Sequence, residues 1–215
     1  SLLGVQWSNA GGNQLSATWD SLRASGPSDQ RFNSVSSPLY LSRDSDYVIP
    51  VFKSCFIRPG TSCAGDNLKD VNLSGANLAN MDFTGAYMKN ANLRSTTLDD
   101  TNFTDAYMKG ADFSDAIGAQ TKLGARSLAD ANFSRVRLRS PKATGTSFLR
   151  SKWIEASVFK GDFSSSNFYK SNFEGASLIA TDMRATKLRG VSWERAEVRD
   201  SNFGGSVGNS PPRRG

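Results

Sequence analysis

The stretch DNLKDVNLSGANLANMDFTGAYMKNANLRSTTLDDTNFTDAYMKGADF (66–113) places a large apolar residue at every fifth position, starting from Leu68. The register continues to Phe203 without an inserted or deleted residue, which makes 28 units, and 26 of the 28 central residues are large and apolar. A small residue lies two positions before the centre in 24 units, and Asn or Asp lies between the two in 13. Self-similarity at a fixed period predicts a solenoid in which each unit packs on its neighbours.

The period of five matches neither an α-helix nor a half-buried strand, whose apolar residues recur about every 3.6 and about every 2 residues. The chain is therefore expected to bend after each unit, so that four bends close a coil of 20 residues. The centres also repeat at 20, because one column of centres collects aromatic residues and another has none. These columns are Leu73, Leu93, Phe113, Phe133, Trp153, Phe173, Trp193 and Leu78, Leu98, Gly118, Leu138, Val158, Leu178, Val198. Stacked coils explain the difference, since interiors are close-packed and each centre must fit those above and below it.

The consensus A(D/N)LXX, as in ANL (76–78), ADF (111–113) and SNF (171–173), closely resembles the pentapeptide repeat family. The resemblance implies an all-β fold, a right-handed quadrilateral β-helix of about seven coils over residues 66–205. The small residues are expected to point inward, and Asn and Asp are suited to tight turns because they bond nearby backbone groups. At a strand spacing of about 4.8 Å, the rod would be roughly 34 Å long.

The two ends of the chain do not share the repeat. Residues 1–45 are expected to be an irregular extension, either disordered or packed through Trp7 and Trp19, with a short helix at about 13–24. Residues 46–65 are expected to cap the solenoid, and YVIPVF (47–52) suits an edge strand because Pro50 lacks an N–H. Residues 206–215, rich in Gly, Ser and Pro, are expected to form a flexible tail. They lack the C-terminal helix that dimerises some family members, so a monomer or weak oligomer is expected.

The only two cysteines, Cys55 and Cys63, bracket a Pro-Gly turn that would bring their sulfur atoms together. Two interpretations remain open, a disulfide and a pair of free buried thiols. A metal site needs more ligands than these, and the chain has no His, so neither metal nor cofactor is expected. A disulfide would indicate an oxidising compartment. The family resemblance favours the thylakoid lumen or the periplasm, and secretion also qualifies.

Two places in the repeat depart from the pattern. Gly118 removes a central side chain, and Arg126 stands where a small inward residue belongs. An unpaired charge in a dry core is very unfavourable, so we expect the backbone to leave the regular coil within 116–127 and Arg126 to reach water or an acid such as Asp130. Pro141 and Ala143 form the second departure, which we interpret as drift of a degenerate repeat rather than a functional loop.

Catalysis is not expected. Without His, a Ser–His or Cys–His nucleophile is excluded. The carboxylate pair Asp99–Asp100 lies in the repeat, where it is expected on the surface. No apolar run approaches about 18 residues, so no membrane-spanning segment is expected.

The net charge of +6 is uneven along the chain. Residues 61–125 carry 5 basic and 8 acidic side chains, whereas residues 126–215 carry 16 basic and 8 acidic. Some family members imitate DNA with strongly acidic faces and thereby inhibit a topoisomerase, and the positive charge disfavours that role here. The basic cluster comprises Arg135, Arg137, Arg139, Lys142, Arg150 and Lys152. Nucleic-acid binding is nevertheless disfavoured, because acids are interleaved and an oxidising compartment would exclude it.

The sequence therefore favours a rigid structural or interaction module that binds a protein partner, or a membrane protein complex. In a regular coil the residue after each centre points outward, and five of these residues in the basic half are apolar or aromatic. They are Leu149, Ile154, Phe159, Tyr169 and Ile179, and Lys152, Lys160, Lys170 and Arg199 form their rim. Stacking by 20 is expected to place Phe159 beside Ile179 on one face and Leu149 beside Tyr169 on another. A contiguous apolar surface with a polar rim marks an interaction site. Two alternatives remain open: the first 50 residues cover this surface, or the apolar residues are scattered without a role.

Overall fold

The computed structural model describes residues 5–8, 14–17, 39–42, 48–51, 55–209 and 211. Strands β1 (Val5–Ser8) and β2 (Gln14–Ala17) pair antiparallel. The prediction of a helix at 13–24 is therefore wrong at Gln14–Ala17, where polar and apolar residues alternate with the period of a strand.

Strands β3 (Leu39–Ser42) and β4 (Val48–Val51) form a second antiparallel pair. Pro50 is accommodated because β4 is an edge strand, and the proposed cover through Trp19 lies outside the described residues.

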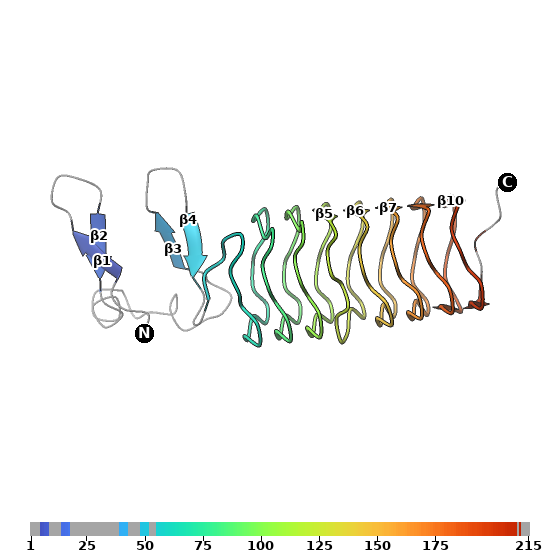
Figure 1. Cartoon of the computed structure of the whole chain (residues 1–215), viewed down its shortest axis with the longest axis horizontal. Helices are drawn as coiled ribbons and strands as arrows, with labels where there is room; N and C mark the ends of the chain where they lie inside the picture. Colours follow the sequence, from blue (N-terminus) through green and yellow to red (C-terminus); the bar gives the residue numbers. More distant parts are fainter. Residues whose placement is uncertain are drawn as a thin grey trace.

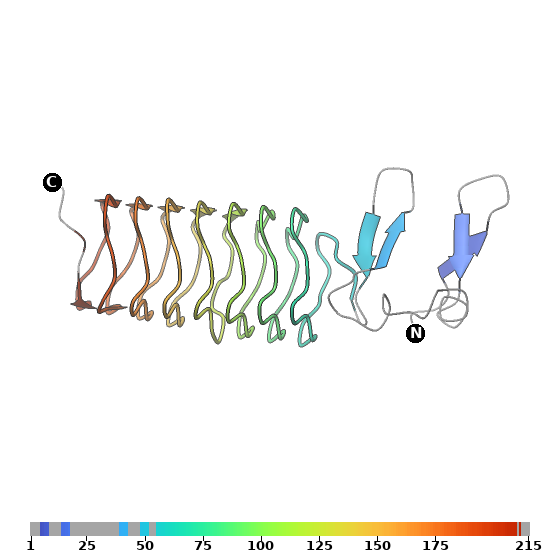
Figure 2. The ribbon, with the colours of Figure 1, turned by 180° about the vertical axis from the view of Figure 1, so that it is seen from behind.

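The chain from Gly60 to Asn209 winds into stacked coils of 20 residues (Figures 1 and 2). Parallel bridges join residues 20 apart, and one column of bridges runs from Ser62 to Asn202 in seven steps. Extended strands form mainly along one side of the rod. They are β5 (Ile117–Ala119), β6 (Arg137–Arg139), β7 (Ser157–Phe159), β8 (Ser177–Ile179) and β10 (Glu197–Arg199). The predicted class, an all-β quadrilateral β-helix, is confirmed.

Each unit bends because its fifth residue adopts a left-handed backbone. From Gly60 to Gly205 every fifth residue has a positive φ except Ala125. The turn is closed by a backbone bond, such as that from Ala76 N to Leu73 O at 3.0 Å. Asn before the centre reinforces it, since Asn77 Oδ1 accepts a hydrogen bond from Ala79 N at 3.1 Å. Asn or Asp before the centre thus stabilises the bend in the units that carry it, as the sequence predicted.

The interior is filled by the central residues and by the small residues two positions before them. Phe83, Phe103 and Leu98 are completely buried. Small hydroxyl residues also satisfy buried carbonyl groups, because Thr101 Oγ1 donates to Leu78 O at 2.8 Å and Thr121 Oγ1 donates to Leu98 O at 2.9 Å. Buried polar atoms are therefore paired inside the rod, as a stable core requires.

The expected departure near Arg126 is present. Ala125 is buried in place of residue 126, and Arg126 is exposed. The backbone shifts by one residue, since Ala125 N donates to Leu123 O and Arg126 N donates to Ala106 O. The charge thereby reaches solvent while a methyl group occupies the core.

Gly118 is required by its surroundings rather than being a gap in the core. A Cβ atom there would lie 2.4 Å from Thr121 Oγ1 and 2.9 Å from Leu98 Cβ. Pro141 is also accommodated, because the residue at this position normally donates only the turn bond and not a bond between coils. Its ring lies against Gly161, where an added Cβ would be 3.2 Å from Pro141 Cγ.

The C-terminal end continues the solenoid further than expected. Strand β11 (Val207–Gly208) pairs in parallel with β9 (Lys187–Leu188), although residues from 206 onward were expected to be a flexible tail. Trp193 Nε1 donates to Asn209 O at 2.6 Å, which holds this segment against the last aromatic centre. Residues 206–209 therefore extend the ladder and help to close the core.

Candidate functional site

The parallel sheet of β5–β8 and β10 runs along one side of the rod (Figure 1). The residues on either side of each central residue face outward and form two columns. The register of the sheet places each residue beside the one 20 positions later. We call this surface the sheet face. It comprises Ile117, Arg137, Ser157, Ser177 and Glu197 in one column and Ala119, Arg139, Phe159, Ile179 and Arg199 in the other.

The sheet face carries exposed apolar side chains. Ile117 is 40% exposed and Phe159 is 38% exposed, which makes them two of the four large exposed hydrophobic residues in the described part of the chain. Ile179 is half-buried and lies directly beside Phe159 in the register. The sheet therefore holds apolar side chains in fixed positions toward solvent.

Cations lie between these apolar residues. Arg137 and Arg139 are both exposed, and neither forms an ion pair with any residue that the structure describes. Lys160 Nζ lies 5.2 Å from the centre of the Phe159 ring, a cation–π distance. By contrast, Arg199 is paired with Glu197 within the same face. The positive charge on the sheet face is thus concentrated on Arg137, Arg139 and Lys160.

Two other basic residues of the predicted cluster, Arg135 and Arg150, are paired with acids. Arg135 Nε donates to Asp115 Oδ1 at 2.7 Å and Arg150 Nε donates to Asp130 Oδ1 at 2.7 Å, in both cases with a second bond from Nη2. These hydrogen bonds and charges lower the pKa of Asp115 and Asp130, although desolvation opposes the shift. Asp130 therefore pairs with Arg150 and not with Arg126.

The apolar residues predicted from sequence lie on more than one side of the rod, as the period of 20 implies. Leu149 and Tyr169 precede Phe159 and Ile179 by ten residues, which is half of a 20-residue coil, so the two pairs lie on opposite sides of the rod. Ile154 lies at the corner between them and is half-buried. The Leu149–Tyr169 side has its own cation–π pair, in which Lys170 Nζ lies 5.3 Å from the centre of the Tyr169 ring.

The sequence did not predict Ile117 as part of this surface, nor that Arg137 and Arg139 lie on the strand next to Phe159. The prediction used apolar residues that follow a centre, whereas Ile117 and Arg137 precede their centres and also point outward. The signal was the alternation around Leu138, because Arg137 and Arg139 are exposed and the leucine between them is buried. The same oversight hid Tyr87, which is 39% exposed and stacks on Tyr107 with ring centres 5.3 Å apart.

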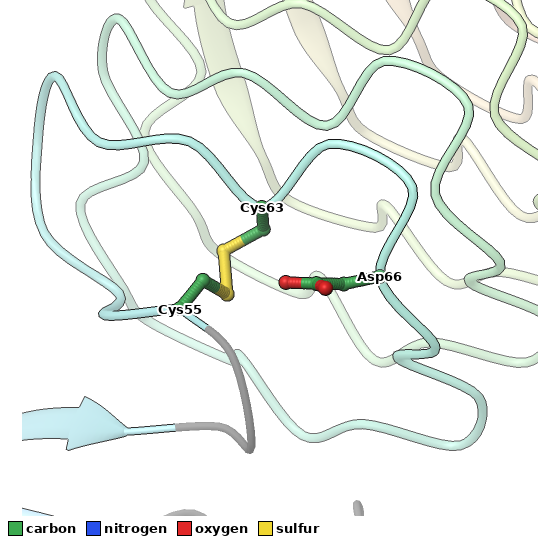
Figure 3. A group of neighbouring side chains, drawn as sticks. All are labelled: Cys55, Cys63 and Asp66. Atoms are coloured by element: carbon green, nitrogen blue, oxygen red, sulfur yellow. A yellow bond between two sulfur atoms is a disulfide. The ribbon is translucent and has the colours of Figure 1, made fainter. Parts of the chain in front are cut away.

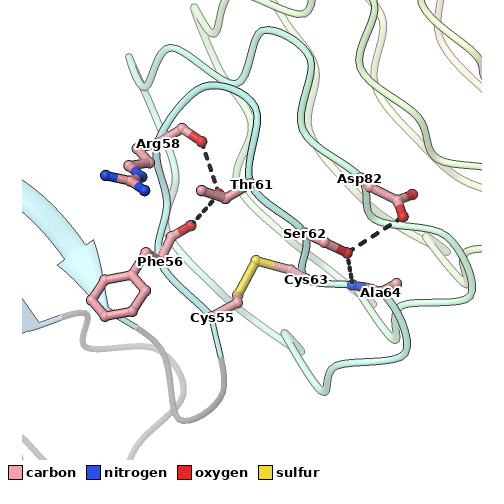
Figure 4. The surroundings of a disulfide bond; sticks show 8 residues. All are labelled: Cys55, Phe56, Arg58, Thr61, Ser62, Cys63, Ala64 and Asp82. Atoms are coloured by element: carbon pink, nitrogen blue, oxygen red, sulfur yellow. Dashed lines mark hydrogen bonds between the residues drawn. A yellow bond between two sulfur atoms is a disulfide. The ribbon is translucent and has the colours of Figure 1, made fainter. Parts of the chain in front are cut away.

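The N-terminal end of the solenoid is closed by a disulfide between Cys55 and Cys63, whose Cα atoms are 5.2 Å apart. Cys63 occupies a centre in the column of Phe83, and both cysteines are buried. Figure 4 shows Thr61 beside them, where its hydroxyl group donates to Phe56 O at 2.6 Å. The disulfide therefore links the first turn of the solenoid to the N-terminal end of the core.

Asp66 lies beside the disulfide (Figure 3). The potential ligand atoms of Cys55, Cys63 and Asp66 lie within 4.8 Å of one another. Thiolates are the sulfur species that bind metals, and the disulfide holds both sulfur atoms in another form. With Cys55 and Cys63 joined in a disulfide, this group has a structural role.

Residues 67–117 and 162–192 match the family model described as pentapeptide repeats, in 8 copies. The stacked 20-residue coils and their left-handed fifth residues have the geometry that these repeats require. The matched segments of the solenoid are pentapeptide repeats. In the described part of this protein, no helix is long and apolar enough to cross a membrane. Comparison with curated proteins finds no match.

Several solved pentapeptide repeat structures resemble the domain. HetL, involved in heterocyst differentiation regulation in Nostoc sp. strain PCC 7120, is 19% identical with a TM-score of 0.28, over 69% of this chain and 75% of that one. QnrB1, a plasmid-mediated fluoroquinolone resistance protein, is 15% identical with a TM-score of 0.38, over 70% and 90%. A protein from the Arabidopsis thaliana thylakoid lumen is 16% identical with a TM-score of 0.22, over 60% and 71%.

Proposed function

We propose that this protein is a rigid, non-catalytic interaction module that docks on a protein partner or a membrane-associated complex. The observation that carries the proposal is the pair of exposed apolar residues Ile117 and Phe159 on a regular sheet. Bonds to the coils on either side hold this backbone, so a partner would meet a preformed surface and little ordering would oppose binding. Leu149, Ile154, Tyr169 and Ile179 extend the proposed contact area around the rod.

We further propose that the protein acts in an oxidising compartment, such as the thylakoid lumen, the periplasm or the cell exterior. The buried disulfide supports this, since structural disulfides persist where thiols are not kept reduced. Extraction from the source in a denaturant that contains an alkylating agent and no reductant should leave Cys55 and Cys63 unlabelled, because only free thiols react. Two labelled cysteines would place the protein in a reducing compartment.

A regulator that binds nucleic acid or a nucleic-acid enzyme is the second candidate. The unpaired cations of the sheet face favour it, and so does the column in which Lys122 lies directly beside Lys142. Imitation of DNA would need a negative surface instead.

Photo-crosslinking in an extract of the native source tests the interaction module. A benzophenone amino acid replaces Phe159 on the sheet face, Tyr169 on the opposite side, or Tyr87 in the acidic half. Light-dependent adducts with one discrete protein at position 159 or 169, and fewer at position 87, would support the module. Adducts with nucleic acid would favour the second candidate, and the lack of adducts at positions 159 and 169 would contradict protein docking.

A further inference from the structure

We propose that the sheet face binds an acidic protein segment that also carries apolar side chains. The inference rests on the proposed interaction function and adds the chemistry of the partner. It arises from the order of residues across three neighbouring strands, which neither the fold nor the family model specifies.

The three strands alternate apolar and basic positions. The register places Ile117 of β5 beside Arg137 of β6, and Arg139 of β6 beside Phe159 of β7. The two columns read Ile117–Arg137–Ser157 and Ala119–Arg139–Phe159, with about 4.8 Å between neighbouring strands. The two large apolar residues therefore lie diagonally on either side of the row of two guanidinium groups. A partner that covers all three rows must therefore present carboxylates between apolar side chains.

The charge of this row determines which partner can cover it. Arg137 and Arg139 have no ion-pair partner among the described residues, and Lys160 adds a third cation over the Phe159 ring. A neutral partner would remove the guanidinium groups from water without a carboxylate bonded to either of them, which opposes binding. The nearby Asp115 carboxylate attracts Arg137 but is hydrogen-bonded to Arg135. Carboxylates can accept two parallel hydrogen bonds from one guanidinium group and would restore the lost solvation.

The apolar residues favour protein over nucleic acid. Proteins that bind single-stranded nucleic acid without sequence preference use basic residues to contact the phosphates and aromatic rings on which the bases stack. The aliphatic side chains of Ile117 and Ile179 offer no such ring, and Lys160 already lies over Phe159. An apolar centre with arginine beside it is typical of protein interfaces, where aromatic residues and Arg are enriched.

Fluorescence anisotropy with defined probes tests the proposal on the full chain. The first probe is a labelled peptide in which Glu alternates with Leu and Phe, the second is a polyglutamate peptide of the same length, and the third is a DNA duplex. We expect the alternating peptide to bind about tenfold more tightly than polyglutamate, because only it fills the apolar sites. Its affinity should fall as salt is added, since exposed charges are screened.

Two pairs of variants separate the sheet face from general effects. Arg137→Glu with Arg139→Glu should weaken peptide binding about tenfold or more, whereas Lys69→Glu with Lys89→Glu, which changes the net charge equally, should change it by about twofold or less. Phe159→Ser should weaken binding, and Tyr87→Ser, at a residue of nearly equal exposure, should not.

The remaining outcomes would overturn the proposal. Equal binding of both peptides, or binding of neither, would exclude an acidic and apolar partner. Tighter binding of the duplex, lost in the double arginine variant and retained in Phe159→Ser, would assign the face to nucleic acid. Protein adducts at position 159 or 169 in the photo-crosslinking experiment, without selective peptide binding, would leave the interaction module intact and remove only this partner assignment.

Discussion

The indole ring of Trp153 stacks on the ring of Phe133, with their centres 4.2 Å apart and their planes 8° from parallel. Phe173 stacks on the other side at 5.6 Å. The indole Nε1 donates to Ser151 Oγ at 2.8 Å, so the only polar atom of this buried side chain is also satisfied. The centre of the aromatic column therefore combines full burial, ring stacking and a paired donor.

Trp153→Ala should lower the free energy of unfolding by about 3–5 kcal/mol, the range for large-to-small substitutions in a core. The physical reason is a cavity between Phe133 and Phe173, together with a lost partner for Ser151. Denaturant unfolding followed by circular dichroism measures the change. Phe159→Ser is the control, because its side chain is partly exposed and its loss should be about 1 kcal/mol or less. If Phe159→Ser unfolds the protein, Phe159 is a packing residue and the docking proposal fails.

The repeat could be predicted because the same requirement recurs in every unit. Of the 28 units, 26 have a large apolar centre, 24 have a small residue two positions before it and 13 have Asn or Asp between them, so chance substitutions do not hide the register. The stacking of Trp153 and Trp193 against Phe173 follows from the period of 20 in the same way. The fold class and the order of residues in each column could therefore be predicted from the sequence.

The candidate surface was only partly predictable, because it depends on which outward residues share a side of the rod. Phe159 and Lys160 were identified from their places after a centre. Ile117 was not identified, because it precedes its centre, and Arg137 was identified only as part of the basic cluster and not as part of the same surface. Their neighbourhood emerges only when strands of successive coils are aligned in space.

Ala125 and Arg126 provide a test of the one-residue shift. Because Ala125 points into the core and Arg126 points to solvent, Ala125→Arg should destabilise the fold by about 3–5 kcal/mol, as expected for an unpaired buried charge. Arg126→Ala should change stability by about 0.5 kcal/mol or less. Thermal unfolding of the two variants decides the matter. The reverse order of effects would show that residue 126 occupies the core.

The disulfide should stabilise the N-terminal end of the rod selectively. Replacing both Cys55 and Cys63 with Ser should lower stability by up to about 3 kcal/mol, because the unfolded chain loses a crosslink. Amide hydrogen exchange should quicken around Cys63 and Phe83 and remain slow near Trp153, since repeat units depend mainly on their neighbours. Wild-type protein whose disulfide has been reduced should show the same stability and the same hydrogen exchange as the double variant. Uniform acceleration along the whole rod would instead indicate that the staple controls global unfolding.

Asp82 should make the fold sensitive to acid. Hydrogen bonds from Thr84 lower the pKa of Asp82, desolvation opposes them, and bonds from Ser62 and Asn102 assist. Because the folded pKa lies below the unfolded one, the ionised carboxylate stabilises the fold above the unfolded pKa, and this contribution is lost as pH falls through the folded pKa.

Asp82→Asn should therefore lose less stability than wild type between about pH 7 and about pH 3 in urea unfolding. Its amide oxygen can still accept from Thr84 N, as Asn102 does for Thr104 N at 3.1 Å. Asp82→Ala, which loses that bond, should be weakened at both pH values, and an equal acid response of Asp82→Asn and wild type would contradict the assignment.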